Sequence, residues 1–509
     1  MDKHPFRLGI EFISRHGEVQ QCGSWPVNAV VTSSMRDDPA AFQSTAPGLK
    51  HGAVGLIGAS AMGVAMLSPA MAVYLNFGAI TLYAGKAGPL VFILALAATL
   101  PTALSYALVA RELPSSGSAF EWARKSINPP VGVAVGCITA IYYIMNVLMQ
   151  PITFGIFSRD LLALTGWTQP FAGWAVGAIF SSAVCAWLVY RGIQPSAHGA
   201  LGFLLAEMSI IFALAVTVVV VQAPKGVLDA TPFLPSSSPH GASGLFQGLV
   251  FALLTFCGFD VISTVAEEAK ASRTLIPRAT MLALALFAIF VIAHTWAFSF
   301  SKPIAAIAAD VQAGKLPVTE IARDYWGRGY FVVILTGLSA TIGVFIATAV
   351  GASRVVYAIA REGYLPRIFS VVHSGTQAPA NALHLVFGIS IVCGSIAVFI
   401  LGPYPAYLWW GAASVFFAML TYLAVNVTNF LFHYRYRRPQ FNWFLHGVVP
   451  AIGAALDLEV LYKSFFQELL AQSWKEGRSV VVFSVLLALL AVWKAWTTRN
   501  AAKTSGSGA

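Results

Sequence analysis

Long apolar segments alternate with short polar ones along most of the chain. From residue 53 onward, the apolar segments are bounded by charged residues or by Pro and Gly. An α-helix needs roughly twenty predominantly apolar residues to cross a bilayer, and these segments are long enough to do so. They lie at 53–78, 88–110, 131–155, 170–190, 199–222, 244–266, 279–300, 329–356, 380–401, 407–432, 446–466 and 479–497. This pattern predicts an all-α polytopic membrane protein with 12 transmembrane helices.

The two ends of the chain lack this pattern. Residues 1–50 are polar and mixed, without the short apolar segment of a cleavable signal peptide, and we expect them to form a disordered cytoplasmic tail. The sequence that follows Met35 would suffice as a start, which leaves open whether residues 1–34 belong to the native protein. Residues 498–509 are expected to form a C-terminal tail, whose final SGSGA resembles a linker without function.

Composition and charge agree with a membrane protein. Of the 509 residues, 57% are hydrophobic and 10% are charged, against about 25% charged residues in ordinary soluble domains. If the N-terminus and the loops after even-numbered segments are cytoplasmic, 21 of the 31 Lys and Arg residues lie on that side. Positive residues favour the cytoplasmic side, so the net charge of +10 reflects topology and not nucleic-acid binding. We expect a multi-pass protein of the cytoplasmic (inner) membrane with both termini in the cytoplasm.

The outer loop 302–328 differs from the other loops. Its apolar residues have helix-like spacing in AAIAADVQAG and TEIARDYWG. This spacing predicts short amphipathic helices at the surface.

The sequence contains no catalytic or metal-binding motif that we recognise. An HExxH, a GxSxG and a Walker loop are all missing, and the five cysteines show neither a pairing pattern nor a C-x-x-C. We therefore expect no enzyme activity, no metal and no cofactor. A channel is disfavoured as well, because no filter-like segment or ring-forming repeat is visible.

Two apolar segments carry small residues and glycine at mid-depth. The first contains GASAMGVAMLSP, and the sixth contains TFCGFD and is followed by a cluster of charged residues. In lipid an unpaired peptide group is costly, so interrupted helices persist only where they line a cavity enclosed by protein. Interruptions at corresponding places in two halves of a chain mark the binding site of many transporters. The pattern therefore predicts a substrate site at these two segments.

Several polar segments are similar to those of a known family. Residues 258–278 combine a glycine–aromatic–acid turn, an acidic helix end and an Ile-Pro entry to the next helix. Further segments are ARELPSSGSAFEWARKSINPPVGVAVG, SRVVYAIAREGYLPRIF (353–369) and APANAL (378–383). Together they resemble the signature segments of the amino acid–polyamine–organocation (APC) superfamily over residues 51–497.

The resemblance implies a fold and a mode of action. It implies a transporter core within residues 51–432, built as a 5+5 inverted repeat with helices 1 and 6 interrupted, and two further helices within 433–497. It also implies a secondary active transporter (permease) that works by alternating access. Of the G-x-G core that many members have in helix 1, only Gly63 remains, and Ala271-Ser272 replaces an Asn-Pro pair after the acidic helix end.

The candidate substrate-binding residues lie on helices 1, 3 and 6. The resemblance implies a substrate beside the two interrupted helices, with Phe256 and Phe259 as a gate, for which packing is the alternative. Asn146 follows Tyr142 and Tyr143 in the third segment, and it could bind substrate or hydrogen bond to a neighbouring helix. The full candidate set is Ser60, Ala61, Met62, Gly63, Val64, Asn146, Phe256, Cys257, Gly258, Phe259 and Asp260.

Two carboxylates lie inside predicted helices, where an ionisable residue is costly and marks a functional candidate. Asp260 precedes Glu267 by seven residues and lies roughly 10 Å deep, and Glu207 lies roughly 13 Å deep. We predict proton coupling at Glu207 and Asp260, or pairing with a substrate amine; a protonated or backbone-bonded carboxyl is the alternative. A cation site at Thr341 and Thr348 is a further hypothesis, and its alternative is hydrogen bonding to the carbonyl four residues earlier.

These observations predict a permease for an amino acid that works by proton-coupled symport or by exchange. The amino acid would place its carboxylate at N–H groups of helix 1 and its amine at carbonyls of helix 6. The alternative is a polyamine or another organic amine, which would pair with the two buried carboxylates. The expected partners are a small-molecule substrate, the lipid bilayer and protons. The sequence leaves open the identity of the substrate, symport or exchange, the coupling ion and the oligomeric state.

Overall fold

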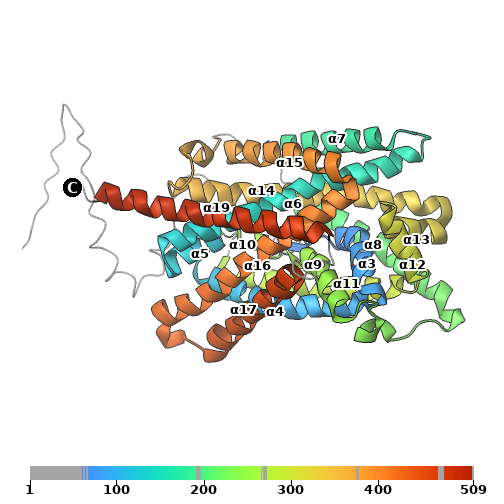
Figure 1. Ribbon diagram of the computed structural model, residues 1–509, viewed down its shortest axis with the longest axis horizontal. Helices are drawn as coiled ribbons and strands as arrows, with labels where there is room; N and C mark the ends of the chain where they lie inside the picture. Colours follow the sequence, from blue (N-terminus) through green and yellow to red (C-terminus); the bar gives the residue numbers. More distant parts are fainter. Residues whose placement is uncertain are drawn as a thin grey trace, which may run out of the picture. The chain divides into compact units, whose positions relative to one another are not determined.

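The structure is a computed structural model that describes residues 60, 63–64, 67–190, 197–264, 266, 272–373, 378–467 and 475–506. Within these ranges every regular element is a helix (Figure 1). The predicted N-terminal tail, Ala61, Met62 and the acidic pair Glu267 and Glu268 lie outside the described residues.

The long helices follow the apolar segments closely. Their bounds are α4 (Gly88–Glu112), α6 (Pro129–Ala163), α7 (Pro170–Tyr190), α8 (Ala197–Gln222), α9 (Gly241–Phe256), α11 (Ser272–Phe298), α14 (Phe331–Arg361), α15 (Ala380–Leu401), α16 (Pro403–Tyr436), α17 (Val449–Leu461) and α19 (Lys475–Gly506). Shorter helices are α2 (Pro69–Met71), α3 (Phe77–Ala84), α5 (Ala119–Ser126), α10 (Val261–Thr264), α12 (Ile304–Gln312) and α13 (Pro317–Trp326). The π-helical turns η2 (Ala72–Asn76), η11 (Trp443–Val448) and η12 (Tyr462–Gln467) continue helices that they adjoin.

Eleven helical stretches among the described residues are long and apolar enough to cross a membrane. One of them, Pro69–Glu112, runs for 44 residues and contains residues 69–78 of the first predicted segment and the whole second one. A 3₁₀ turn, η3 (Gly85–Ala87), joins α3 to α4, and Gly85 takes φ 60° there. The sequence predicts twelve transmembrane helices, and the described residues give eleven stretches because parts of the first two predicted segments fall within one stretch, which turns at Gly85. The 5+5 inverted repeat stays a prediction.

Local sequence signals explain where several helices begin. The side chain of Asn128 accepts a hydrogen bond from the N–H of Val131 at 2.9 Å, and Pro129 fits the first turn of α6 because its missing N–H would be unpaired there. At the other end of a helix, Gly363 with φ 83° follows the last turn of α14.

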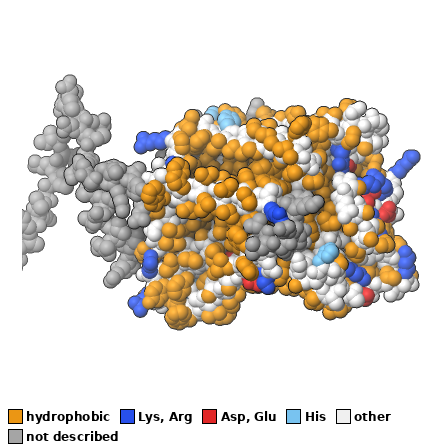
Figure 2. All heavy atoms as spheres, in the orientation of Figure 1, with side chains coloured by type: hydrophobic (Ala, Val, Ile, Leu, Met, Phe, Trp, Pro, Cys, Tyr) orange, Lys and Arg blue, Asp and Glu red, His pale blue; other side chains and the backbone are white. Residues whose placement is uncertain are grey.

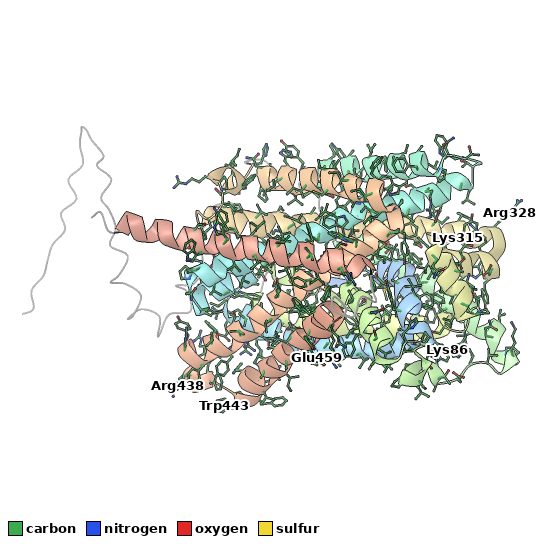
Figure 3. All side chains as sticks on the ribbon, in the orientation of Figure 1. Lys86, Lys315, Arg328, Arg438, Trp443 and Glu459 are labelled. Atoms are coloured by element: carbon green, nitrogen blue, oxygen red, sulfur yellow. The ribbon has the colours of Figure 1, made fainter. Side chains whose placement is uncertain are left out.

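The surface of the helices suits a lipid environment. Large apolar side chains are strongly exposed along several of them, including Phe399 at 84%, Ile400 at 71% and Ile179 at 70%. Figure 2 shows hydrophobic side chains over most of the visible face, with charged ones gathered mainly toward two ends. In Figure 3, Lys315 and Arg328 lie toward one end and Arg438 toward the other. Exposed apolar surface of this extent between two charged ends identifies a multi-pass membrane protein.

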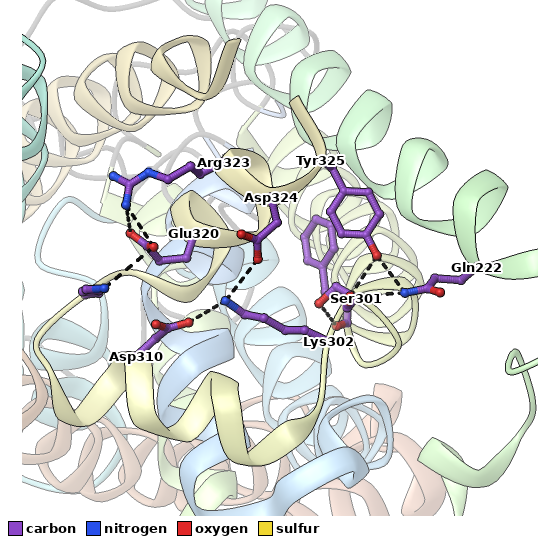
Figure 4. A network of polar contacts seen from close by, with 10 residues as sticks. Gln222, Ser301, Lys302, Asp310, Glu320, Arg323, Asp324 and Tyr325 are labelled. Carbon is purple, nitrogen blue, oxygen red and sulfur yellow. Dashed lines mark hydrogen bonds and ion pairs between the residues drawn. The ribbon is translucent and has the colours of Figure 1, made fainter. Parts of the chain in front are cut away.

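The predicted amphipathic helices of the loop 302–328 are confirmed as α12 and α13. Lys302 joins them through ion pairs with Asp310 at 2.5 Å and Asp324 at 3.5 Å (Figure 4). The amide nitrogen of Gln222, at the end of α8, donates to the Tyr325 hydroxyl at 2.8 Å. This network holds α12 and α13 together and ties the loop to the end of α8.

Candidate functional site

The sixth transmembrane segment is interrupted, as the sequence predicts. α9 ends at Phe256, and α10 begins at Val261. Cys257 is extended, and Gly258 has φ 130°, a conformation that side-chain-bearing residues rarely adopt. The interruption therefore depends on glycine at this position.

Asp260, the last residue of the interruption, lies in a cage of hydroxyl groups. Its carboxylate accepts hydrogen bonds from Tyr142 at 3.2 Å and Tyr143 at 2.5 Å, both on α6, and from Tyr422 on α16 at 3.1 Å. The N–H of Gly258 donates a fourth bond at 3.1 Å. Asp260 is 1% exposed, and all four donors are neutral groups. We call Tyr142, Tyr143 and Tyr422 the tyrosine cage.

Aromatic rings pack around the interruption on both sides. The Phe259 ring lies 5.4 Å from Tyr106 and 5.2 Å from Tyr422, between centroids. The Phe256 ring lies 5.2 Å from Phe287 of α11. Both phenylalanines are buried, so this structure shows them in packing contacts, and a gating role stays a prediction.

A short contact ties α10 to the segment before α5. The hydroxyls of Ser263 and Ser118 lie 2.6 Å apart, and Ser118 has φ 45°. Trp122 of α5 packs edge-on against Tyr106 at 5.4 Å. These contacts cover one side of the interruption.

Helix 1 is interrupted at Ser68 and Pro69, the last two residues of the predicted stretch GASAMGVAMLSP. Ser60, Gly63 and Val64 are helical, and the left-handed residue is Ser68, with φ 43°, followed by Pro69. Proline disfavours helical backbone in the residue before it, which accounts for this position. A Cβ on Gly63 would meet the side chain of Ile262, so the first helix approaches α10 closely here. The role of residues 60–64 in substrate binding stays a prediction.

Asn146 bonds to a neighbouring helix. Its amide donates to the Ser414 hydroxyl of α16 at 2.7 Å and to the Tyr142 carbonyl at 3.1 Å. The structure thus shows the interhelical bond that we considered as the alternative to substrate binding.

Glu207 has partners other than those of Asp260. It is 7% exposed on α8 and hydrogen bonds to Ser339 of α14. Asp260 and Glu207, which the sequence predicts at similar depths, therefore contact different residues. Proton coupling at either one stays a prediction.

The two threonines of the hypothetical cation site bond within their own helix. Thr341 donates to the Gly337 carbonyl at 2.7 Å, and Thr348 donates to the Val344 carbonyl at 2.8 Å. The described residues contain no group of three or more His, Cys, Asp or Glu side chains placed to hold a metal ion.

One buried carboxylate is not among the candidates predicted from the sequence. Asp457 of α17 is 2% exposed and accepts from the Asn426 amide at 3.0 Å. Its signal was present, because it lies in the apolar segment 446–466 just as Glu207 lies in the segment 199–222. Tyr422 was also missed, since nothing in an apolar segment marks one tyrosine as the partner of a distant aspartate.

Comparison with known proteins gives a family and several relatives. Residues 53–493 match the family described as Amino acid permease. The "Low-affinity putrescine importer PlaP" of Escherichia coli (strain K12) is 27% identical over 339 residues, which cover 65% of this chain and 72% of that protein. The "Branched-chain amino acid permease BcaP" of Bacillus subtilis (strain 168) is 24% identical over 65% of this chain and 72% of that protein. The "Cationic amino acid transporter 4" of Mus musculus is 26% identical over 60% of this chain and 49% of that protein.

Proposed function

Because this chain belongs to the amino acid permease family, we propose that it moves an amino acid across the cytoplasmic membrane by alternating access, in proton-coupled symport or exchange. The observation that carries the proposal is the buried Asp260 at the interruption between α9 and α10. The distribution of Lys and Arg supports a cytoplasmic location for both termini.

The site has the chemistry to bind an ammonium group. The carboxylate of Asp260 lies just beyond the C-terminal end of α9, where the helix dipole is negative and carbonyl groups lack partners in the helix. An ammonium there would meet a negative charge and several oxygen acceptors. The tyrosine hydroxyls could reorient toward the substrate, because each is both a donor and an acceptor.

The carboxylate of an amino acid needs a second group of partners. The left-handed Ser68 ends the regular helix 1 backbone and precedes a proline, which has no N–H. Helix 1 also approaches α10 at Gly63. We infer that backbone N–H groups of helix 1 receive the substrate carboxylate near this approach.

An organic amine such as a polyamine is the second candidate. The donors around Asp260 are neutral, so they leave the negative charge of the carboxylate available to a cationic substrate. In addition, one relative is named a putrescine importer. A polyamine would make no use of N–H groups on helix 1. The two candidates therefore differ in their dependence on a substrate carboxylate.

Flux into proteoliposomes separates these candidates. The purified chain would be reconstituted and tested with a panel of labelled amino acids and with putrescine, with and without an imposed pH gradient. Saturable amino-acid uptake that rises with an inward proton gradient supports the proposal, and putrescine uptake alone supports the alternative. Asp260→Asn should abolish uptake, whereas Asp324→Asn, at a side chain that is 54% exposed, should retain it. Absence of saturable flux for both substrate classes would overturn the proposed function.

A further inference from the structure

The connection between α16 and η11 carries three arginines among exposed aromatic side chains. Its sequence is YRYRRPQFNWF (434–444), and it joins the membrane-crossing stretches Pro403–Tyr436 and Trp443–Gln467. Within it, Tyr434 is 42% exposed and Trp443 is 68% exposed. Because one stretch ends and the next begins here, we place these side chains at the level of the lipid headgroups. Tyrosine and tryptophan are enriched at that level, where the apolar part of the ring meets lipid and the polar part meets water.

Ring contacts join these aromatic residues into one surface. Phe441 lies at its centre. The centroid of its ring is 6.0 Å from that of Phe430, 5.8 Å from that of Tyr434 and 5.1 Å from that of Trp443. The guanidinium of Arg438 lies over the Tyr434 ring, 5.4 Å from the centroid. We call Phe430, Tyr434, Arg438, Phe441 and Trp443 the Arg438 platform.

Among the described residues, Arg438 has no carboxylate partner. The neighbouring Arg437 pairs with Glu112 at 3.4 Å, and no described ion pair includes Arg438. Arg435 donates to the Ser126 carbonyl at 3.1 Å, which is a neutral acceptor. Arg438 is exposed, so its guanidinium can donate to a group outside the chain. The connection therefore offers positive charge that the described carboxylates do not compensate.

The platform lies where lipid can reach it. Figure 3 shows Arg438 and Trp443 at the edge of the molecule, at the opposite end from Arg328. The distribution of Lys and Arg predicts that the end with Arg438 is cytoplasmic. Basic residues next to the cytoplasmic end of a membrane helix attract anionic lipids of that leaflet.

The platform fits a ligand that is both anionic and amphipathic. A guanidinium binds a phosphate group through two parallel N–H···O bonds. The aromatic rings beside Arg438 suit the glycerol and the first acyl carbons of a phospholipid. A soluble phosphate would use the guanidinium alone, whereas a phospholipid would use the rings as well. In a zwitterionic lipid, the cationic part of the headgroup would meet the positive charges of Arg435 and Arg438, which disfavours it.

We propose that the Arg438 platform binds the phosphate headgroup of an anionic phospholipid from the cytoplasmic leaflet. Arg438 holds the phosphate, and Phe441 and Trp443 contact the glycerol and the upper acyl chains. The proposal goes beyond the proposed function, because it holds for any transported substrate.

The test measures lipid binding to the full chain in detergent. Dioleoylphosphatidylglycerol or dioleoylphosphatidylcholine is added, native mass spectrometry counts the lipids that remain bound, and the rise of the melting temperature with lipid concentration gives an apparent affinity. The unmodified chain should retain phosphatidylglycerol in preference to phosphatidylcholine. Arg438→Gln should weaken the affinity for phosphatidylglycerol by about fivefold, the contribution of one arginine near an anionic lipid surface. Arg328→Gln is the matched control, because Arg328 is also exposed and lies at the opposite end (Figure 3).

A second variant separates a lipid from a soluble phosphate. Trp443→Ala keeps every arginine and removes the ring that is 68% exposed, so it should also weaken phosphatidylglycerol binding. Glycerol phosphate, the headgroup without acyl chains, should bind the unmodified chain far more weakly than the lipid. Each affinity is taken relative to the same variant without lipid, so a change in folding stability does not affect the comparison.

Three results would overturn the proposal. The first is an unchanged affinity for phosphatidylglycerol in Arg438→Gln and Trp443→Ala. The second is an equal loss in Arg438→Gln and Arg328→Gln, which would indicate a general attraction between charges. The third is binding of glycerol phosphate as tight as that of the lipid, which would exclude a phospholipid as the specific occupant.

Discussion

Replacement of Gly258 by alanine should disrupt the site through the backbone alone. Gly258 has φ 130°, outside the regions that L-residues with a Cβ occupy readily. Holding a non-glycine residue there costs about 1–3 kcal/mol, unless the turn shifts. A shift would move the Gly258 N–H, which bonds to Asp260 at 3.1 Å, and with it the carboxylate inside the tyrosine cage. We therefore expect Gly258→Ala to lower both thermal stability and substrate uptake.

The matched control is Gly388→Ala in α15. A Cβ on Gly388 would meet open space, and its backbone is helical, so alanine should leave uptake unchanged and stabilise the helix by about 0.5–1 kcal/mol. Unfolding in detergent, followed by tryptophan fluorescence, and uptake into proteoliposomes measure the two effects. If Gly258→Ala matches the unmodified chain in both assays, the requirement for glycine at the interruption is refuted.

Four further predictions concern single substitutions, one of them with a matched control. Tyr143→Phe removes a hydrogen bond to the Asp260 carboxylate, and such a bond to a charged acceptor is worth about 1.5–3 kcal/mol. The apparent substrate affinity in uptake assays should therefore change by about tenfold or more. An unchanged affinity would contradict a role of the tyrosine cage in substrate binding. Glu207→Gln should abolish the pH dependence of uptake, and an intact pH profile would exclude coupling through this residue. Gly63→Leu should block the close approach of helix 1 to Ile262 and reduce uptake, while Gly343→Leu, at a position with open space, should not. Asp229→Asn should destabilise the protein at neutral pH but not in strong acid. Hydrogen bonds from Thr231, with Lys86 nearby, lower the pKa of Asp229 in the folded protein. The contribution of the Asp229 carboxylate to the free energy of unfolding is therefore present above the unfolded pKa of about 3.9 and disappears as pH falls through the folded pKa.

The helices and one interruption could be predicted from the sequence because both are local properties. Apolar length defines a membrane helix, and the Gly258 turn beside a carboxylate identifies the break in the sixth segment. The connection at Gly85–Ala87 could not be predicted, since a 3₁₀ turn and a loop have similar composition. In the first segment, the predicted stretch GASAMGVAMLSP contains the break at Ser68 and Pro69, but its composition alone does not mark which residue leaves the helix.

The partners of the buried carboxylates depend on how helices are rotated against one another. Depth can be counted along a helix, and this count places Asp260 and Glu207 at similar depths. In the structure one contacts α6 and α16 and the other contacts α14. Tyr422 is 162 residues from Asp260 in the chain, a separation over which hydrophobic periodicity carries no pairing information.

The four donors that surround Asp260 also bear on how tightly a substrate can be held. An arriving ammonium does not meet an unsatisfied acceptor, because the carboxylate already has hydrogen bonds from three hydroxyls and one N–H. The ammonium replaces some of these donors. The binding free energy is then the difference between two hydrogen-bonded states of the carboxylate, which is a small fraction of the gross strength of a hydrogen bond. Such an exchange favours a loosely held substrate that leaves as readily as it enters. For a carrier that must release its cargo on the opposite side, rapid turnover then takes precedence over tight capture.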